Sequence, residues 1–405
     1  MSVVDFIQSN IDLTTKMIQD VGGEETLIKL PYPFTTPCIE GIFQEMYYWD
    51  TYFTQKALYL TDRKEQAWNN VRNFTYLLNT YGKILNGNRT HFLKNSQPPF
   101  FGLMLFDLLS QTDNCISYQE AFECLEKEYA FWMSKRVSSN GLNHYDYDFA
   151  DGQQIANPDT VRWYRSRTGV DLEITEENCR NIRAEAESGW DFSARYNGQC
   201  ANCNAIDLNC LLYADELLLS EWATRLNMQD KAKYYLSQAT LRKEKMFNLM
   251  RDEKGVWYDY NFVTRKRMDV ISCAAFFPYF VGLDNNQEGY LQTLSSLETP
   301  YGVIASTTPR RTYQWAAPNG WAPLHYVAVA AADKLALKDV AKRLAEKYLR
   351  TLDNIFTKTG RLWEKVNIET GDMQVTSEYR TPEMLGWTAG VYMAFYEYRK
   401  NGKLI

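Results

Sequence analysis

Helical periodicity runs through this sequence from one end to the other and limits the possible folds more than any other feature. Apolar side chains recur at every third or fourth position in long segments, which is the pattern of a helix with one buried face. Segments with the alternating pattern of a strand are short, and 255–260 is predicted to form one arm of a small hairpin. We expect helices at 6–18, 65–78, 118–135, 208–226, 230–249, 322–335, 338–351 and 387–398.

The predicted helices follow one another in pairs along all 405 residues. No linker rich in Pro, Gly or Ser divides the chain, and no fixed-period repeat indicates a regular solenoid. We therefore expect one all-α domain, 1–405, in which helical hairpins close into a toroid. Connections without periodicity would crowd one rim of it, where functional sites usually lie: 86–100, 144–167, 188–207, 303–321 and 360–388.

Charge and hydropathy exclude several classes of partner. The net charge is −6 and no basic block exists, so nucleic acid is not an expected partner. No apolar run reaches about 18 residues, so no membrane span is expected. Residues 1–8 lack the basic start and apolar stretch of a secretion signal. We expect a cytoplasmic protein that is a monomer or a weak homo-oligomer.

The eight cysteines are expected to be free thiols, because several lie in apolar, helix-like text and the chain is not small. Cys200 and Cys203, with Cys210 close behind, resemble part of a zinc clip. A zinc site requires a fourth ligand at suitable spacing, and the chain has only three histidines. We expect no metal at these cysteines.

Aromatic and amide side chains concentrate in two of the non-helical stretches. In 39–53, Trp49 offers an apolar face to a sugar ring and Asp50 offers an acceptor to its hydroxyls, although Asp50 is equally suited to cap a following helix. In 86–100, Asn86 and Gln97 each donate and accept hydrogen bonds, which favours a polar neutral ligand. The 15% aromatic content agrees with a sugar-binding protein, but a large aromatic core explains it more simply.

Two carboxylates have surroundings suited to acid–base chemistry. Asp191 follows a Ser-Gly turn and stands between Trp190 and Phe192, and an apolar wall raises the pKa of a carboxyl group, as a general acid requires. Glu364 precedes Lys365, whose charge favours the ionised form that a general base requires. An N-cap role for Asp191 and a surface-strand role for Glu364 are the structural alternatives.

Taken in order, the motifs resemble those of the trehalase family over about 43–391. The sequence Tyr-Tyr-Trp-Asp-Thr-Tyr-Phe at 47–53 is similar to one family signature, and Gln-Trp at 314–315 with Pro-Asn-Gly-Trp-Ala-Pro at 318–323 is similar to the other. Four further matches are Asn-Gly-Asn-Arg at 86–89, Ser-Gln-Pro-Pro-Phe-Phe at 96–101, Glu-Ser-Gly-Trp-Asp at 187–191 and Gly-Trp-Thr-Ala-Gly at 386–390.

The resemblance implies an (α/α)6 barrel with long rim loops and an inverting glycoside hydrolase that acts on trehalose or a related small α-glucoside. It implies Asp191 as general acid and Glu364 as general base, with carboxyl groups about 6.5–9.5 Å apart so that a water fits between base and sugar. The resemblance also implies a small neutral saccharide as substrate and no metal or organic cofactor. The implied substrate-binding residues are Phe43, Tyr47, Trp49, Asp50, Asn86, Gln97, Asp159, Arg183, Gly189, Trp190, Trp315 and Glu378.

Three positions depart from the family pattern, because Ile42, Asn95 and Asn157 stand where it has arginine. A hydrogen bond to a charged group contributes about 1.5–3 kcal/mol, so these replacements would weaken trehalose recognition unless another arginine enters the site. The candidates for that role are Arg162, Arg165 and Arg167.

Because three family arginines are replaced, other functions remain possible. One is hydrolysis of another α-glycoside, such as glucosylglycerate or mannosylglycerate, whose carboxylate requires a cation in the aglycone pocket. A sugar-binding relative without catalysis is a second, although both candidate carboxylates are present. A sugar epimerase is disfavoured, because such enzymes rely on paired histidines and His91, His144 and His325 are scattered.

Overall fold

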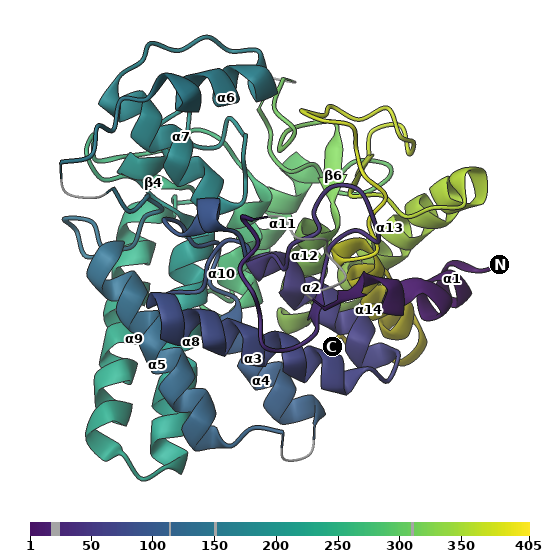
Figure 1. Ribbon diagram of the computed structural model, residues 1–405, viewed down its shortest axis with the longest axis horizontal. Coiled ribbons are helices and arrows are strands. Elements are labelled where there is room, and N and C mark those ends of the chain that lie inside the picture. The colour runs from purple at the N-terminus through teal and green to yellow at the C-terminus, as the bar shows by residue number, and fades with distance from the viewer. Residues whose placement is uncertain (18–24, 113–114, 150–151, 309–311) are drawn as a thin grey trace.

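Helices dominate the structure, a computed structural model that describes residues 1–17, 25–112, 115–149, 152–308 and 312–405 (Figure 1). They account for 54% of the chain, and the strands have two or three residues each. The prediction of an all-α fold is confirmed.

In the described part of the chain, six helices form a closed inner ring. Each contacts the next around the ring, and the last returns to contact the first. Four of these helices are buried along most of their length, as expected for elements surrounded by other helices. The ring consists of α2 (Tyr48–Leu60), α4 (Phe101–Gln111), α8 (Ile206–Arg225), α10 (Phe277–Phe280), α12 (Ala322–Lys334) and α14 (Trp387–Asn401).

A second set of helices packs on the outside of the ring and buries one face only. In α13 (Lys338–Thr359) the buried residues recur every three or four positions from Ala341 to Phe356, so a single stripe faces α12 and α14. The other outer helices are α3 (Lys64–Tyr81), α5 (Tyr118–Lys135), α9 (Gln229–Met250) and α11 (Gln287–Leu297). The short α1 (Val3–Asn10) precedes them.

Most predicted helices agree with the structure to within three residues, both in the inner ring (α8, α12 and α14) and outside it (α3, α5 and α9). Helix α5 has the predicted bounds, and Ser117 begins it with a capping box to Glu120. The predicted helix at 6–18 is wrong in length, since α1 ends at Asn10, a 3-10 turn (η1, Ile11–Thr14) follows, and residue 18 lies outside the described residues. The predicted helix at 338–351 continues to Thr359, where Gly360 ends it with φ +67°.

Short strands and two further helices lie on one side of the ring. In Figure 1, α6 (Pro158–Thr168) and α7 (Glu176–Ser188) lie together above the ring helices, on the same side as β6 (Asn319–Trp321). Strand β6 pairs antiparallel with β7 (Lys365–Asn367). A three-stranded sheet joins β3 (Cys203–Asn204), β4 (Tyr260–Asn261) and β5 (Lys266–Arg267), and a separate pair joins β1 (Thr15–Lys16) and β2 (Phe34–Thr35).

The predicted hairpin arm at 255–260 lies too early in the chain, because the β4–β5 ladder begins only at Tyr260. The remaining 3-10 turns are η3 (Thr90–Phe92), η4 (Cys200–Asn202) and η5 (Cys273–Phe276).

The ring closes where α14 meets α2, and glycine makes this close approach possible. A Cβ on Gly390 would lie 1.9 Å from the carbonyl oxygen of Phe53 and 2.7 Å from its carbon. One turn earlier, the N–H of Gly386 donates to the carbonyl of Pro37 at 2.9 Å. The contact is made to backbone, which cannot rotate away as a side chain can.

We expect Gly390→Ala to destabilise the fold by at least about 1–3 kcal/mol, the usual cost of overpacking, because the helices must separate to admit the methyl group. Thermal unfolding followed by circular dichroism measures the loss. Lys400→Ala on the exposed face of the same helix is the matched control and should leave the melting temperature unchanged. A Gly390→Ala protein as stable as the wild type would show that the α2–α14 contact is not tight.

Candidate active site

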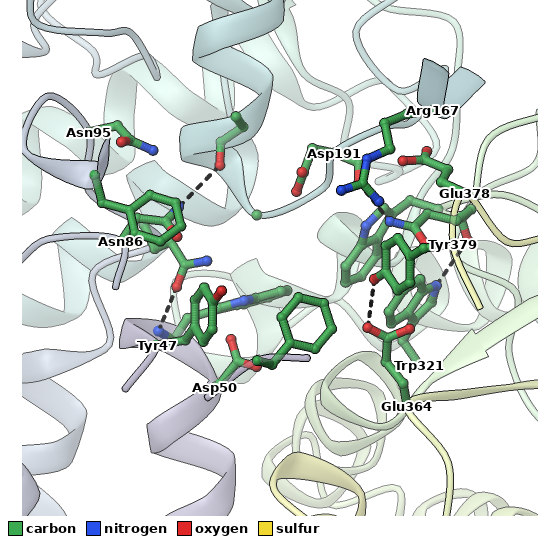
Figure 2. Close-up of a pocket in the computed structure, with 18 of the residues that line it drawn as sticks. Tyr47, Asp50, Asn86, Asn95, Arg167, Asp191, Trp321, Glu364, Glu378 and Tyr379 are labelled. Carbon is green, nitrogen blue, oxygen red and sulfur yellow. Dashed lines mark hydrogen bonds between the residues drawn. The ribbon is translucent and has the colours of Figure 1, made fainter. Parts of the chain in front are cut away.

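The five non-periodic stretches of the sequence converge on one pocket above the ring, with a volume of about 440 Å³ (Figure 2). Such a volume suits a small organic ligand. The side chains that line it are mostly aromatic, amide or carboxylate, and they come from elements far apart in the chain. They are Phe43, Tyr47, Trp49, Asp50, Asn86, His91, Phe92, Asn95, Gln97, Tyr147, Trp163, Arg167, Arg183, Ala186, Gly189, Asp191, Gln314, Trp315, Trp321, Glu364, Glu378, Tyr379, Met384 and Trp387.

The first turn of α2 supplies Trp49 and Asp50. The helix begins at Tyr48 with no side-chain cap, so the capping alternative for Asp50 is wrong. Burial, with smaller contributions from the charges of Glu364 and Asp191, raises the pKa of Asp50 to about 8. The backbone N–H of Trp49 donates to Oε1 of Gln97 at 3.2 Å, which ties this turn to the amide-rich loop.

The amide-rich loop is held to the end of α7. The Asn86 side-chain nitrogen donates to the carbonyls of Ser96 at 3.3 Å and Ala186 at 3.4 Å. Ser96 in turn donates its N–H to Glu187, a fully buried carboxylate on α7. Asn86 and Gln97 therefore line the pocket from fixed positions.

Asp191 enters the pocket from a turn that ends α7. Gly189 is in the left-handed region with φ +74°, and a Cβ there would lie 3.1 Å from the ring of Trp49. Gln314 donates to the backbone carbonyl of Asp191 at 2.9 Å. Trp190 faces the other way, fully buried, with its ring centroid 5.1 Å from that of Trp315. The N-cap alternative for Asp191 is wrong, since α7 ends before this residue and no helix begins at it.

Desolvation dominates the electrostatics at Asp191. Burial raises its pKa to about 7, the nearby charge of Glu364 adds to the shift, and the guanidinium of Arg167 opposes it. Glu378 lies close by and accepts the N–H of Phe192 at 3.0 Å. Burial and the charge of Asp191 raise the pKa of Glu378 to about 8. The pocket thus holds carboxyl groups that are protonated near neutral pH.

Glu364 lies across the pocket from Asp191 (Figure 2). It is 2% exposed, so its side chain is buried and the surface-strand alternative is wrong. The ammonium of Lys365 pairs with Oε2, and the Tyr379 hydroxyl donates to Oε1 at 2.6 Å. Trp387 donates its indole N–H to the Glu364 carbonyl at 3.0 Å. Both carboxylate oxygens therefore accept hydrogen bonds from fixed donors.

The turn that carries Asp191 is anchored by buried ion pairs. Arg195 is fully buried, donates to Asp207 at 2.8 Å and 2.9 Å, and donates to Asp259 at 2.7 Å and 2.8 Å. Its guanidinium also lies 4.7 Å from the ring centroid of Trp190. Ser193 donates its N–H to Glu185 on α7 at 2.7 Å. These contacts fix both ends of the turn.

Most of the residues expected from the sequence lie together in this pocket, and two do not. Asp159 is exposed at the start of α6 and pairs with Arg162. Trp190 lies behind the pocket wall. Of the three arginines considered as replacements, Arg162 and Arg165 are exposed and paired with Asp159 and Asp171, whereas Arg167 lines the pocket.

Sequence reasoning missed several lining residues. Gln314, Trp321 and Trp387 stand inside motifs that were noted, and Tyr379 follows Glu378, so proximity to a motif was the available signal. Tyr147 and Trp163 carried no such signal, because they belong to 144–167, where no motif was found.

Within the described residues, no group of His, Cys, Asp and Glu gathers in a way that could hold a metal ion. Cys200, Cys203 and Cys210 are buried, and all eight cysteines are free. No helix in the described ranges is long and apolar enough to cross a membrane.

Comparison with known proteins agrees with this geometry. The trehalase family model matches residues 4–399. The chain is 33% identical to the periplasmic trehalase of Xanthomonas oryzae pv. oryzae, over 90% of this chain and 68% of that protein. It is 31% identical to the periplasmic trehalase of Pseudomonas aeruginosa, over 93% and 73% of the two chains.

Solved structures share the fold. Neutral trehalase Nth1 from Saccharomyces cerevisiae superposes with a TM-score of 0.76 at 27% identity, covering 98% of this chain and 80% of that one. A GH63 mannosylglycerate hydrolase from Thermus thermophilus superposes with a TM-score of 0.62 at 15% identity, covering 90% and 96%. The second likeness concerns the fold alone.

The fold and the pocket define a glycoside hydrolase built as an (α/α)6 barrel, and both expectations are confirmed. The chain belongs to the trehalase family.

The expectation of a cytoplasmic protein is wrong. The relatives in Xanthomonas and Pseudomonas are named periplasmic trehalases, and this finding contradicts the expectation. The expectation rested on the lack of a signal in residues 1–8 and on free thiols. Free thiols do not require a reducing compartment when they are buried, because burial raises the pKa of groups such as Cys200 and Cys203 and disfavours the reactive thiolate.

We expect Arg195→Met to destabilise the protein by about 3–5 kcal/mol, because it leaves Asp207 and Asp259 buried without their cation. The loss should be larger at pH 8 than at pH 5, since protonation relieves an unpaired buried carboxylate. Urea unfolding at both pH values measures it. Arg225→Met, which removes only an exposed pair with Glu221, is the control and should unfold with the wild type. Equal midpoints for Arg195→Met and wild type would contradict the anchoring role.

Proposed function

We propose that this protein hydrolyses trehalose with inversion, and that Asp191 is the general acid and Glu364 the general base. The observation that carries the proposal is the pair itself: a carboxyl group with a pKa of about 7 and a second carboxylate held by Lys365 and Tyr379 face one sugar-sized pocket. The trehalase relatives support the choice of substrate. We further propose that 1–405 acts as one catalytic domain without a metal or organic cofactor.

The chemistry follows from the positions of the two groups. Asp191 donates its proton to the glycosidic oxygen as the bond from that oxygen to the anomeric carbon breaks. Glu364 takes a proton from a water, whose oxygen forms the new bond on the opposite face of the ring. One trehalose and one water give one β-glucose, from the attacked ring, and one α-glucose, from the leaving ring.

Aromatic and polar walls suit a neutral sugar. Trp315 and Trp321 stack face to face with centroids 3.8 Å apart and present flat apolar surface, while Asp50, Asn86 and Gln97 offer hydrogen-bonding groups. Phe43 adopts φ +59°, an uncommon conformation for a bulky residue, and is held by edge contacts to Tyr47 and Tyr379. Strain of this kind concentrates at binding sites.

A second candidate substrate is an α-glycoside with an anionic aglycone, such as glucosylglycerate or mannosylglycerate. The observation that favours it is the presence of Arg167 and Arg183 in the pocket, either of which can bind a carboxylate. Assays of these compounds beside trehalose decide between the two substrates.

We expect purified protein to release β-glucose and α-glucose from trehalose in equal amounts at first, as followed by proton NMR before mutarotation. Sucrose, maltose and kojibiose are the comparison substrates. Release of α-glucose alone would contradict inversion. Cleavage of glucosylglycerate or mannosylglycerate in place of trehalose would move the assignment to the second candidate.

We expect Asp191→Asn and Glu364→Gln each to lower kcat for trehalose by about 10²–10⁴-fold, the usual contribution of a general acid or base. Asp191→Asn should keep most of its activity on α-glucosyl fluoride, because fluoride leaves without protonation. Matched controls are Asp159→Asn and Glu383→Gln, which change exposed carboxylates outside the pocket and should leave kcat unchanged. Full trehalose activity in Asp191→Asn would overturn the assignment of the acid.

The pH profile should fall on its alkaline side near pH 7. Asp191 must be protonated to act, and with a pKa of about 7 it loses its proton as the pH rises through that value. Above this point kcat/KM should decrease about tenfold per pH unit. Initial rates between pH 4 and 9 at low trehalose concentration measure the profile. An activity that stays constant to pH 9 would contradict Asp191 as the acid.

A further inference from the structure

Arg167 is an arginine that lines the pocket close to the proposed acid. It lies at the end of α6, partly buried, and lines the pocket wall. Within the described ranges no carboxylate lies at ion-pair distance from it. Its neighbours on the same helix differ, since Arg162 and Arg165 are exposed and paired with Asp159 and Asp171. An unpaired guanidinium in a pocket offers five N–H donors to a ligand.

The guanidinium of Arg167 is held over an aromatic ring that contacts the proposed base. It lies 5.0 Å from the ring centroid of Tyr379, and the hydroxyl of Tyr379 donates to Glu364. A cation over a ring face is attracted to it, so the side chain has a preferred position without an ion pair. Arg167 is thereby oriented while its N–H groups stay available.

Arg167 lies near the proposed acid, Asp191. Its charge lowers the pKa of both Asp191 and Glu378, against the larger effect of burial. Figure 2 shows Arg167 with Asp191 and Glu378 on one side of the pocket, and Asp50 with Glu364 on the other. Arg167 lies in the last turn of α6, which lies above the ring helices in Figure 1.

In an inverting hydrolysis the acid lies beside the leaving group, and the base lies beside the ring that water attacks. We propose that Arg167 binds the leaving half of the substrate, which for trehalose is the second glucose, by charge-assisted hydrogen bonds to its hydroxyl groups. This proposal rests on the function proposed above. It makes Arg167 a residue for substrate recognition that acts on the outgoing sugar and not on the ring that is attacked.

A comparison of two substrates distinguishes binding of the leaving sugar from a general loss of activity. Trehalose has a leaving glucose, whereas α-glucosyl fluoride has the same attacked ring and no leaving sugar. For Arg167→Ala at pH 5.5 we expect kcat/KM for trehalose to fall about 10- to 100-fold, the contribution of hydrogen bonds to a charged group. For α-glucosyl fluoride we expect a change of less than about twofold. Arg165→Ala, two residues away on the same helix, is the control and should match the wild type on both substrates.

Arg167→Lys tests whether the charge alone is sufficient. Lysine keeps the charge near Asp191 but lacks the planar fork of donors, so the alkaline limb of the pH profile should stay in place while KM for trehalose still rises. In Arg167→Ala the limb should also move to higher pH, because the cation that lowers the pKa of Asp191 is gone. At a pH well below the alkaline limb Asp191 is protonated in every variant, so a rise in KM there cannot come from a change in its protonation. Melting temperatures equal to the wild type show that the variants fold.

The outcomes separate the inference from the function on which it rests. If the wild type cleaves trehalose and Arg167→Ala does so equally well, the inference is overturned and the function stands. If Arg167→Ala loses activity on both substrates to the same extent, Arg167 does not act on the leaving half and the inference is overturned. If the wild type cleaves α-glucosyl fluoride but not trehalose, both are overturned.

Discussion

The contact between α14 and α2 is the constraint on which the site depends. Helices that pack side by side form a ring only if the last one reaches the first, and here Gly390 lets α14 meet the backbone of Phe53. That contact joins two parts of the pocket: the first turn of α2 carries Trp49 and Asp50, and Trp387 at the start of α14 donates to the carbonyl of Glu364. Closure of the barrel therefore also sets where the proposed base lies relative to Asp50.

The proposed acid is positioned by a different set of forces. The turn that carries it follows α7 and begins at Gly189. Arg195 holds this turn in place through buried ion pairs with Asp207 and Asp259. Base and acid are thus fixed by independent parts of the structure, one by close helix packing and the other by buried ion pairs. The pocket lies between them, and burial of its carboxyl groups raises the pKa of Asp50, Asp191 and Glu378.

How much of this could be predicted from the sequence depends on what each helix faces. Outer helices such as α5 bury one stripe, so their periodicity is visible. The expectation of an all-α toroid followed from pairs of helices along the chain, such as α8 with α9 and α12 with α13. Helix α2 is buried all round and has no period to detect. The site was recognised from short sequence motifs around Asp191 and Glu364. The sequence did not reveal that Trp190 faces away from the pocket or that Asp159 lies outside it. Those outcomes depend on the direction of a turn and on where α6 sits over the ring.

The role of Arg167 could not be predicted from the sequence either, because the three arginines of α6 have the same chemistry and differ only in their surroundings. Arg162 and Arg165 find exposed carboxylates, while the helix turns Arg167 toward Tyr379 and the carboxyl groups of the pocket. A pocket with Asp50, Asp191, Glu364 and Glu378 on its walls repels an anionic ligand unless a cation offsets them. Arg167 supplies such an offset on the side of the proposed acid. The raised pKa values of Asp50 and Glu378 reduce the negative charge further at neutral pH, so four carboxyl groups can line a pocket for a neutral disaccharide without four negative charges.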